Sequence, residues 1–165
     1  MISIWLCPNN KDTLYLQHII NHLSGIHNSV PFLPHCTLVS GLKLNRSELA
    51  KILDKSIDNY GPIIVNSKRV SYSNIFWKTI FIELLDSKDL ISLQKNINKQ
   101  IKSDIGYKFD PHISLIYKIM PEYLKKEIID SLSLQNSFKM NKVVAVKTDQ
   151  NIVDWKIIVE RELYA

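Results

Sequence analysis

Short apolar runs alternate along the chain with longer stretches in which apolar residues recur every three or four positions. Side chains on one face repeat at every second residue of a strand and about every 3.6 residues of a helix. The short runs therefore predict buried strands and the longer stretches predict amphipathic helices. Strands are expected over 2–7, 35–40, 63–72, 77–85, 112–117, 143–147 and 155–160. Helices are expected over 12–27, 45–60, 88–105 and 121–132.

Capping and breaking residues set the expected ends of these elements. Side chains that cap helices precede three of the stretches: Asp12 or Thr13, Asn45 or Ser47, and Ser87. Pro121 opens the fourth helix, since proline is favoured at a first helical position. Gly41 is expected to end the second strand, and Gly106 the third helix. The inner face of the first helix is expected to contain Leu14, Ile19, Ile20 and Leu23.

The order of the elements repeats along the chain. Strand–helix–strand–helix–hairpin is followed by helix–strand–helix–hairpin, with no low-complexity segment or block of charge between them. Two lobes of antiparallel sheet, with helices on their outer faces and a cleft between them, account for this order. We therefore expect an α+β fold with two pseudo-symmetric lobes, built as a single bilobal domain over residues 1–165.

One short pattern occurs once in each half of the chain. Segment 34–38 reads Pro-His-Cys-Thr-Leu and segment 111–115 reads Pro-His-Ile-Ser-Leu. On a strand, a histidine and the hydroxyl residue two positions further on point to the same face. Two such strands facing one another would bring together His35, Thr37, His112 and Ser114.

Two histidines and two hydroxyls suit acid–base chemistry on a phosphate ester. Hydrolysis of a phosphodiester needs a base that takes a proton from water and an acid that gives one to the leaving oxygen. Histidine can do either near neutral pH, and the hydroxyls can donate hydrogen bonds to the phosphate oxygens. The simpler alternative is a pair of core strands that each bury one hydrogen-bonded histidine.

The chain contains no complete metal-binding pattern. His18 and His22 are four positions apart on one face of the expected first helix, a spacing that can bind zinc. Ile19 stands where the zinc-protease pattern needs a glutamate. We expect these two histidines to be solvated, and we expect no metal and no other cofactor.

The charge balance favours an anionic partner. The 165 residues carry a formal net charge of +5, and the basic residues are scattered along the chain. A small phosphorylated ligand is therefore favoured over a long nucleic-acid track. No apolar run reaches membrane-spanning length and no signal peptide is visible, so a cytoplasmic protein is expected. Cys7 and Cys36 are expected to be buried thiols, although a disulfide is open if their strands are neighbours.

The paired motifs resemble those of the two-histidine phosphoesterases, and the chain as a whole resembles plant and fungal cyclic phosphodiesterases. The similarity includes segments 3–8, 32–35, 111–117 and 147–149, and Trp155. It implies a bilobal, cofactor-independent hydrolase that opens a cyclic phosphate on a ribose. The substrates so implied are ADP-ribose 1″,2″-cyclic phosphate, a by-product of tRNA splicing, and nucleoside 2′,3′-cyclic phosphates.

The resemblance also assigns roles to single residues. His35 and His112 match the two catalytic histidines, with His112 expected as the base and His35 as the acid. Thr37 and Ser114 match the phosphate-binding hydroxyls.

Aromatic residues and loops complete the expected pocket. Tyr117 matches an aromatic residue that contacts substrate, and Trp5 matches one that lines the pocket, with a core position as an equal alternative. Segments 43–47 and 76–78 are expected to be pocket loops, whereas Lys118 is expected to be exposed at a strand end.

Other functions stay open at this point. The chain could be an enzyme of the same superfamily that acts on RNA ends, as a 2′,3′-cyclic phosphodiesterase or ligase, or one that cleaves 2′,5′-oligoadenylate. It could also be a non-catalytic nucleotide-binding module. The expected partner is a small cyclic-phosphate nucleotide or an RNA end, bound by a monomer away from any membrane.

Overall fold

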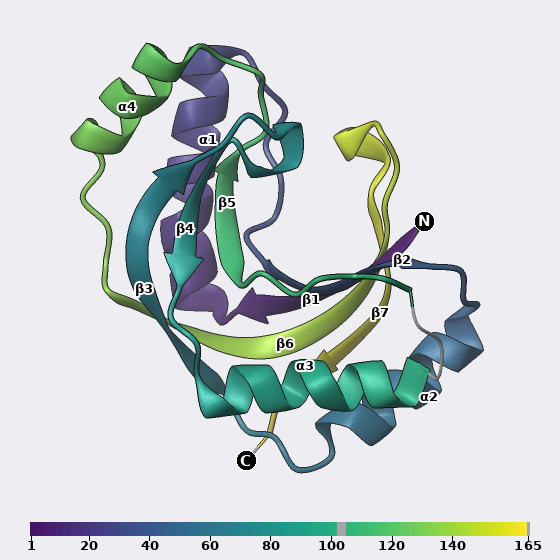
Figure 1. Ribbon diagram of the computed structural model, residues 1–165. Coiled ribbons are helices and arrows are strands. Elements are labelled where there is room, and N and C mark those ends of the chain that lie inside the picture. Colours follow the sequence, from purple (N-terminus) through teal and green to yellow (C-terminus); the bar gives the residue numbers. More distant parts are fainter. Residues whose placement is uncertain (102–104, 165) are drawn as a thin grey trace.

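The computed structural model describes residues 1–101 and 105–164 and has the expected α+β fold (Figure 1). Its strands are antiparallel and follow the order β2-β1-β6-β3-β4-β5, with β7 also paired to β6. The strands are β1 (Ile2–Pro8), β2 (Cys36–Leu42), β3 (Ile63–Tyr72), β4 (Ile80–Leu84), β5 (His112–Ile116), β6 (Ser137–Lys147) and β7 (Lys156–Glu162). The helices are α1 (Asn10–His27), α2 (Arg46–Ile57), α3 (Lys88–Ile101) and α4 (Glu122–Ser131), with short 3-10 helices η1 (Phe76–Lys78) and η2 (Ile152–Asp154).

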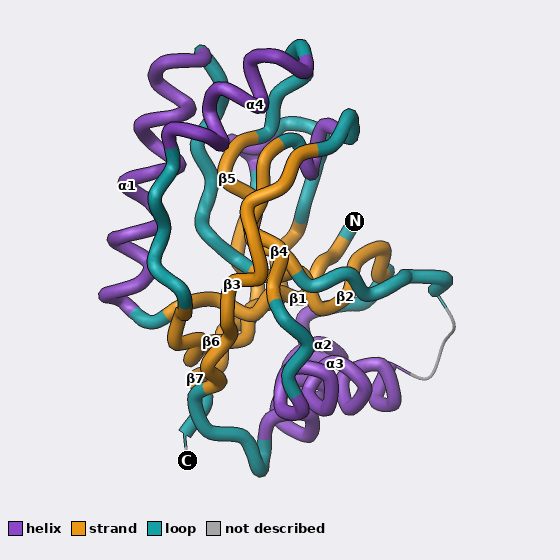
Figure 2. Tube along the Cα trace, turned by 60° about the vertical axis from the view of Figure 1, so that its left-hand side comes forward, coloured by secondary structure: helices purple, strands orange, loops and turns teal. Residues whose placement is uncertain are grey.

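Strand β3 joins two lobes. Its first half, 63–66, pairs with β6, and its second half, 67–72, pairs with β4. Helices α2 and α3 pack on one another and against β7 and β2, whereas α1 packs on β5 and α4 on β3 (Figure 2). We call the part with β1, β2, β6, β7, α2 and α3 the β6 lobe, and the part with β4, β5, α1, α4 and the second half of β3 the β5 lobe.

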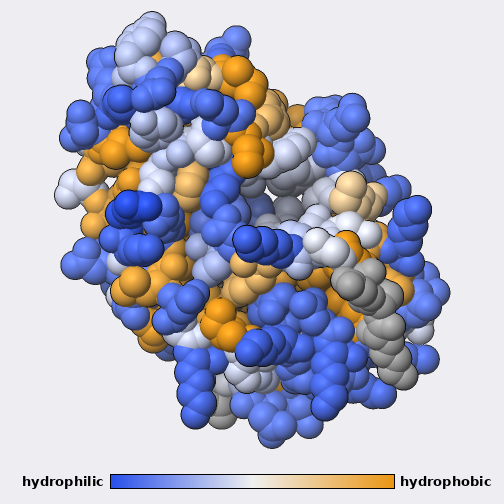
Figure 3. Space-filling model, viewed as in Figure 1, coloured by the Kyte–Doolittle hydropathy of each residue, from blue (hydrophilic) through white to orange (hydrophobic). Residues whose placement is uncertain are grey.

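The two motif strands lie in different lobes and contact each other. Strands β2 and β5 stand at opposite ends of the strand order, yet they pack together because the sheet curls strongly. The surface is hollowed between the lobes (Figure 3). No helix within the described residues is long and apolar enough to cross a membrane.

Alternation along β1 separates the core from this hollow. Ile4 and Leu6 are buried in the main apolar core, while Trp5 points to the other face and packs with Val144 and Val146 of β6. Successive side chains of a strand point to opposite faces. The strand therefore has two apolar faces, one toward the helices and one toward the hollow.

Gly41 does not end the second strand, contrary to expectation, because it forms a bulge within it. Ile2 pairs with Leu42 and Ser3 pairs with Ser40, so Gly41 is the extra residue. Its φ of +94° lies in the left-handed region that glycine adopts without a steric penalty. The strand continues past it to Leu42.

Helix α1 begins earlier than expected. Asn9 is its cap and accepts the amide N–H of Asp12 at 2.8 Å. Asp12 lies in the first turn instead, where its carboxylate accepts the amide N–H of Lys139 at 2.7 Å and ties the helix to β6. Leu14 is not on the inner face, since it is 73% exposed, and the buried face contains Leu16, Ile20 and Leu23.

Other bounds differ from the expected ones. Of the two expected caps, Asn45 and Ser47, it is Asn45 that caps α2, in a capping box with Glu48. The residues expected to end the third helix fall partly at 102–104, outside the described residues, and Ile105 is not helical. Residues 76–78 form η1 rather than the start of a strand, and β6 begins at Ser137, before the expected Val143.

Candidate active site

His35 immediately precedes β2 and is buried at the base of the cleft. A carbonyl oxygen can only accept, so Nδ1 donates its proton to the Leu33 carbonyl at 2.6 Å and Nε2 is the nitrogen left to exchange a proton. The ring stacks face to face on Trp5, with centroids 3.7 Å apart and planes 10° apart. The pKa of His35 is lowered to about 4, chiefly by burial; the Leu33 hydrogen bond opposes this shift and the charge of nearby His112 adds to it.

His112 opens β5 and repeats this arrangement. Its Nδ1 donates to the Asp110 carbonyl at 2.6 Å, again two residues upstream, so Nε2 is again the free nitrogen. The ring meets Phe81 edge-on, with centroids 5.5 Å apart. Burial lowers the pKa of His112 and the ammonium of Lys78 lowers it too, whereas the hydrogen bond and the charge of Asp110 raise it.

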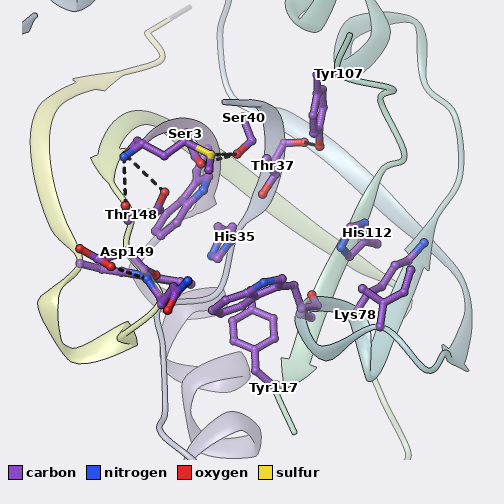
Figure 4. Close-up of a pocket in the computed structure, with 17 residues that line it drawn as sticks. Ser3, His35, Thr37, Ser40, Lys78, Tyr107, His112, Tyr117, Thr148 and Asp149 are labelled. Atoms are coloured by element: carbon purple, nitrogen blue, oxygen red, sulfur yellow. Dashed lines mark hydrogen bonds between the residues drawn. The ribbon is translucent and has the colours of Figure 1, made fainter. Parts of the chain in front are cut away.

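The two hydroxyl residues line the same cleft as the histidines. Thr37 lies on β2, and the Tyr107 hydroxyl donates to its carbonyl at 3.3 Å. Ser114 lies on β5, and its Oγ donates to the Trp77 carbonyl at 3.1 Å. The histidines face one another across the cleft, with Thr37 near the space between them (Figure 4).

Aromatic side chains from both lobes form one wall of the cleft. Tyr117 stacks on Phe32 at 3.8 Å and meets Trp77 edge-on at 5.3 Å. Trp155, from the β6–β7 hairpin, lies 5.7 Å from Trp77 and 5.4 Å from Trp5 between ring centroids. The cleft has a volume of about 580 Å³, within the range of small-molecule sites.

The structure thus gathers every residue that the sequence nominated. His35, His112, Thr37, Ser114, Tyr117 and Trp5 all line this cleft. Trp5 was expected either to line the pocket or to lie in the core. It does both, because it is 3% exposed and yet borders the cleft. Of the two expected loops, 76–78 contributes Trp77 and Lys78, and 43–47 does not border the cleft.

Lys118 lies at the end of a helix rather than in the cleft. Its ammonium donates to the carbonyls of His27 and Asn28, where α1 ends. A cation there stabilises the free carbonyls of the last helical turn. The prediction that Lys118 is exposed at a strand end is therefore only partly right, because its side chain is hydrogen-bonded to the end of α1.

Several lining residues were not nominated from the sequence. Ser3 and Ser40 share a hydrogen bond of 2.8 Å between their Oγ atoms, and Tyr107 precedes the second motif. Thr148, Asp149 and Gln150 come from the β6–β7 hairpin. These residues come from four separate segments, and no local spacing links them.

Neither cysteine is a reactive thiol. Cys7 and Cys36 are free; Cys36 is buried as expected, whereas Cys7 is only partly buried. Desolvation raises the pKa of each thiol to about 12, so both stay protonated near neutral pH. Within residues 1–101 and 105–164, no three side chains of the metal-ligating types lie close enough to share an ion.

Known proteins match this chain over nearly its full length. The family model described as cyclic phosphodiesterase-like protein matches residues 1–163. A cyclic phosphodiesterase of Arabidopsis thaliana is 22% identical over 153 residues, which cover 89% of this chain and 84% of that protein. Among solved structures, a Thermus thermophilus protein has a TM-score of 0.65 at 12% identity, covering 99% of this chain and 97% of that one. E. coli LigT complexed with 3′-AMP has a TM-score of 0.62 at 10% identity, covering 99% and 98%.

The curled two-lobed sheet, with one histidine motif on each of two facing strands, places the protein in the two-histidine phosphoesterase superfamily. Within it, the chain belongs to the cyclic phosphodiesterase-like family and is a hydrolase of the cyclic phosphodiesterase class.

Proposed function

We propose that this protein hydrolyses cyclic phosphates carried on a ribose, namely ADP-ribose 1″,2″-cyclic phosphate and nucleoside 2′,3′-cyclic phosphates. The observation that carries the proposal is the pair of histidines in one cleft, each with Nδ1 held by a backbone carbonyl and Nε2 free. The aromatic wall offers faces on which a base or ribose can stack. Both histidines come from one chain, so a monomer can do the chemistry.

The environments of the histidines favour the reverse of the acid–base assignment expected from the resemblance. His35 is buried and its pKa of about 4 keeps it neutral near pH 7, so its Nε2 can accept a proton from the attacking water. Burial also lowers the pKa of His112, and so does the Lys78 ammonium. Its ring is less buried than that of His35, however, and the hydrogen bond and charge of Asp110 oppose the shift. We therefore propose His35 as the base and His112 as the acid toward the leaving ribose oxygen.

The reaction balances without a cofactor. Water attacks phosphorus, one P–O bond of the cyclic phosphate breaks, and the product is a ribose phosphate monoester. One proton passes from water to His35 and another from His112 to the leaving oxygen. Thr37 and Ser114 stabilise the charge that builds up on the other phosphate oxygens. For Ser114, this requires its hydroxyl to turn away from the Trp77 carbonyl.

The test is hydrolysis of ADP-ribose 1″,2″-cyclic phosphate and of the four nucleoside 2′,3′-cyclic phosphates, followed by phosphorus NMR in EDTA. Wild type should open the ring, and His35→Ala and His112→Ala should each lose about 10²–10⁴-fold in kcat, as expected for a lost general acid or base. His18→Ala is the matched control, because His18 is exposed on α1 and does not border the cleft. No turnover of any substrate by wild type would refute the proposal and direct the search to RNA ends or to binding alone.

A further inference from the structure

A lysine and an aspartate from separate segments meet beside His112. Lys78 is the last residue of η1, and Asp110 lies in the loop before β5. The Lys78 ammonium contacts Oδ2 of the Asp110 carboxylate and lies 4.3 Å from the centroid of the Phe81 ring. The Lys78 side chain is 20% exposed. The Asp110 carboxylate is 57% exposed, so only the lysine end of this ion pair is shielded from solvent.

Both partners of the pair are linked to the imidazole of His112. The Asp110 carbonyl accepts the Nδ1 proton, and Phe81, which carries the Lys78 ammonium on its face, meets the ring edge-on. Lys78 lies on the side of His112 away from His35 (Figure 4). The lysine thus contacts the side chains of the two residues that border the ring, Asp110 and Phe81.

We propose that Lys78 and Asp110 are positioning residues for His112, which fix the orientation of its ring and place one positive and one negative charge against it. The two histidines then differ in how they are held. Both rings donate Nδ1–H to a backbone carbonyl. The ring of His35 also stacks on Trp5, whereas that of His112 meets Phe81, whose face carries the Lys78 ammonium. The role in catalysis rests on the proposed function, but the effect on the ring itself does not need turnover.

The two charges of the pair act on His112 in opposite directions. The Lys78 ammonium lowers the pKa of His112, and the Asp110 carboxylate raises it. Removal of the lysine should therefore raise this pKa, and removal of the carboxylate should lower it. Removal of both should leave the pKa between those of the two single variants.

Other titratable groups near His112 are common to all of these variants. Glu83 pairs with His112 across β4 and β5, and its carboxylate is bound by Arg69 and Lys68. Among the described residues, His35 and Cys36 at the start of β2 and Tyr107 near Asp110 are also close by. Neither substitution removes any of these groups, so opposite shifts of the His112 pKa can be assigned to the pair.

The experiment is a nitrogen-15 NMR titration of the His112 ring in the full chain. Wild type is compared with Lys78→Met, Asp110→Asn and the double variant, without any substrate. We expect the pKa of His112 to rise in Lys78→Met, fall in Asp110→Asn and return toward wild type in the double variant. The single variants should also show a mixture of ring tautomers in place of the pure Nδ1–H form.

Two further variants keep the test decisive. Lys142→Met removes a lysine of similar exposure from an ion pair with Glu160 and should leave the His112 titration unchanged. Lys78→Arg keeps the charge and should keep the wild-type titration, which also guards against misfolding of the methionine variant. Shifts of the same sign in both single variants, or no shift in either, would overturn the proposal.

Kinetics then separate this proposal from the proposed function. Misplacement of the ring should lower kcat by about tenfold in each single variant with little change in KM, because positioning acts on the reacting geometry. If wild type turns over no cyclic phosphate, the proposed function fails while the NMR result stands by itself. If wild type is active and the titrations do not move, this inference alone fails.

Discussion

At the scale of the residue, burial distinguishes the two histidines more than their sequence context does. Both follow a proline and precede a hydroxyl residue by two positions, yet His35 is 6% exposed and His112 is partly open. Desolvation disfavours the charged imidazole. The native state therefore holds His35 neutral at a pH where an unfolded chain would protonate it.

This burial makes stability depend on pH. The pKa of His35 falls from its ordinary 6.5 to about 4 on folding, so the unfolded chain binds the proton first. The stability that His35 contributes is present above pH 6.5 and is lost as the pH falls toward 4. Between pH 7 and pH 5 we expect a loss of about 2 kcal/mol in the free energy of unfolding. Urea unfolding at both pH values measures it.

His35→Gln is the comparison for that measurement. Glutamine does not titrate, so the variant should lose less stability than wild type between pH 7 and pH 5, with His112 supplying part of what remains. An equal loss in wild type and variant would mean that His35 is not held neutral by the fold.

The residues of the site could be predicted from the sequence only where their spacing is local. His35 and Thr37, like His112 and Ser114, are two positions apart on a strand, so one face of one strand presents both. Lys78 and Asp110 come from η1 and from a distant loop, and Trp77 and Trp155 come from different lobes. Their proximity depends on how the sheet curls, which no local pattern records.

At the scale of the element, α4 anchors the turn that carries part of the cleft wall. Lys125 is 1% exposed, and its ammonium donates to the Ser73 carbonyl at 2.9 Å and to Oδ1 of Asn74 at 2.6 Å. It also lies 5.1 Å from the centroid of the Tyr72 ring. A buried ammonium is tolerated only when its protons are bound. Lys125 therefore holds the turn that leads into η1 and Trp77.

Lys125→Met should loosen this turn. Methionine fills similar space but leaves the two acceptors unpaired, so we expect a loss of about 1–3 kcal/mol in the free energy of unfolding. Because Trp77 lies on the cleft wall, KM for the cyclic phosphate should rise while kcat changes less. Lys126→Met is the matched control, since Lys126 is exposed on α4 and its ammonium pairs with Glu122 one turn away. Equal effects of the two variants would contradict a specific role for Lys125.

The elements themselves were predicted best where pattern and caps agree. Asn45 was one of the two caps expected for α2, and the structure confirms it, with Glu48 completing a capping box. The first half of β6 was missed because Lys139 and Asn141 interrupt its apolar positions. That segment is a strand because β1 and β3 pair with it on both sides. Such pairing can override weak local preference.

At the scale of the whole molecule, the two lobes are not the two halves of the sequence. The β6 lobe joins β1 and β2 from one end of the chain to β6 and β7 from the other, and strands β4 and β5 of the β5 lobe lie between these pairs in sequence. The expected bilobal form is confirmed, but which strands pair was not predictable. Partners such as β1 and β6 are far apart in sequence, and apolar periodicity identifies a strand without identifying its neighbour.

Shared strand β3 leads us to expect that residues 1–165 unfold as one unit. One half of β3 belongs to each lobe. If β3 leaves the sheet of one lobe, it therefore also exposes the core of the other lobe. All three tryptophans of the chain, Trp5, Trp77 and Trp155, line the cleft between the lobes, so their fluorescence reports its opening. Circular dichroism reports helices of both lobes. In urea, the two signals should share one midpoint, as in a two-state transition.

Val65→Ala, a substitution within β3, also tests whether the two lobes unfold together. Val65 is fully buried where β3 pairs with Phe138 of β6, and its truncation should lower the free energy of unfolding by about 2 kcal/mol. If the lobes unfold together, both signals move to the same lower urea concentration, although the substitution lies on the β6 side. A shift in fluorescence or in circular dichroism alone would show that the lobes unfold separately, and the cleft would then open without loss of the helices.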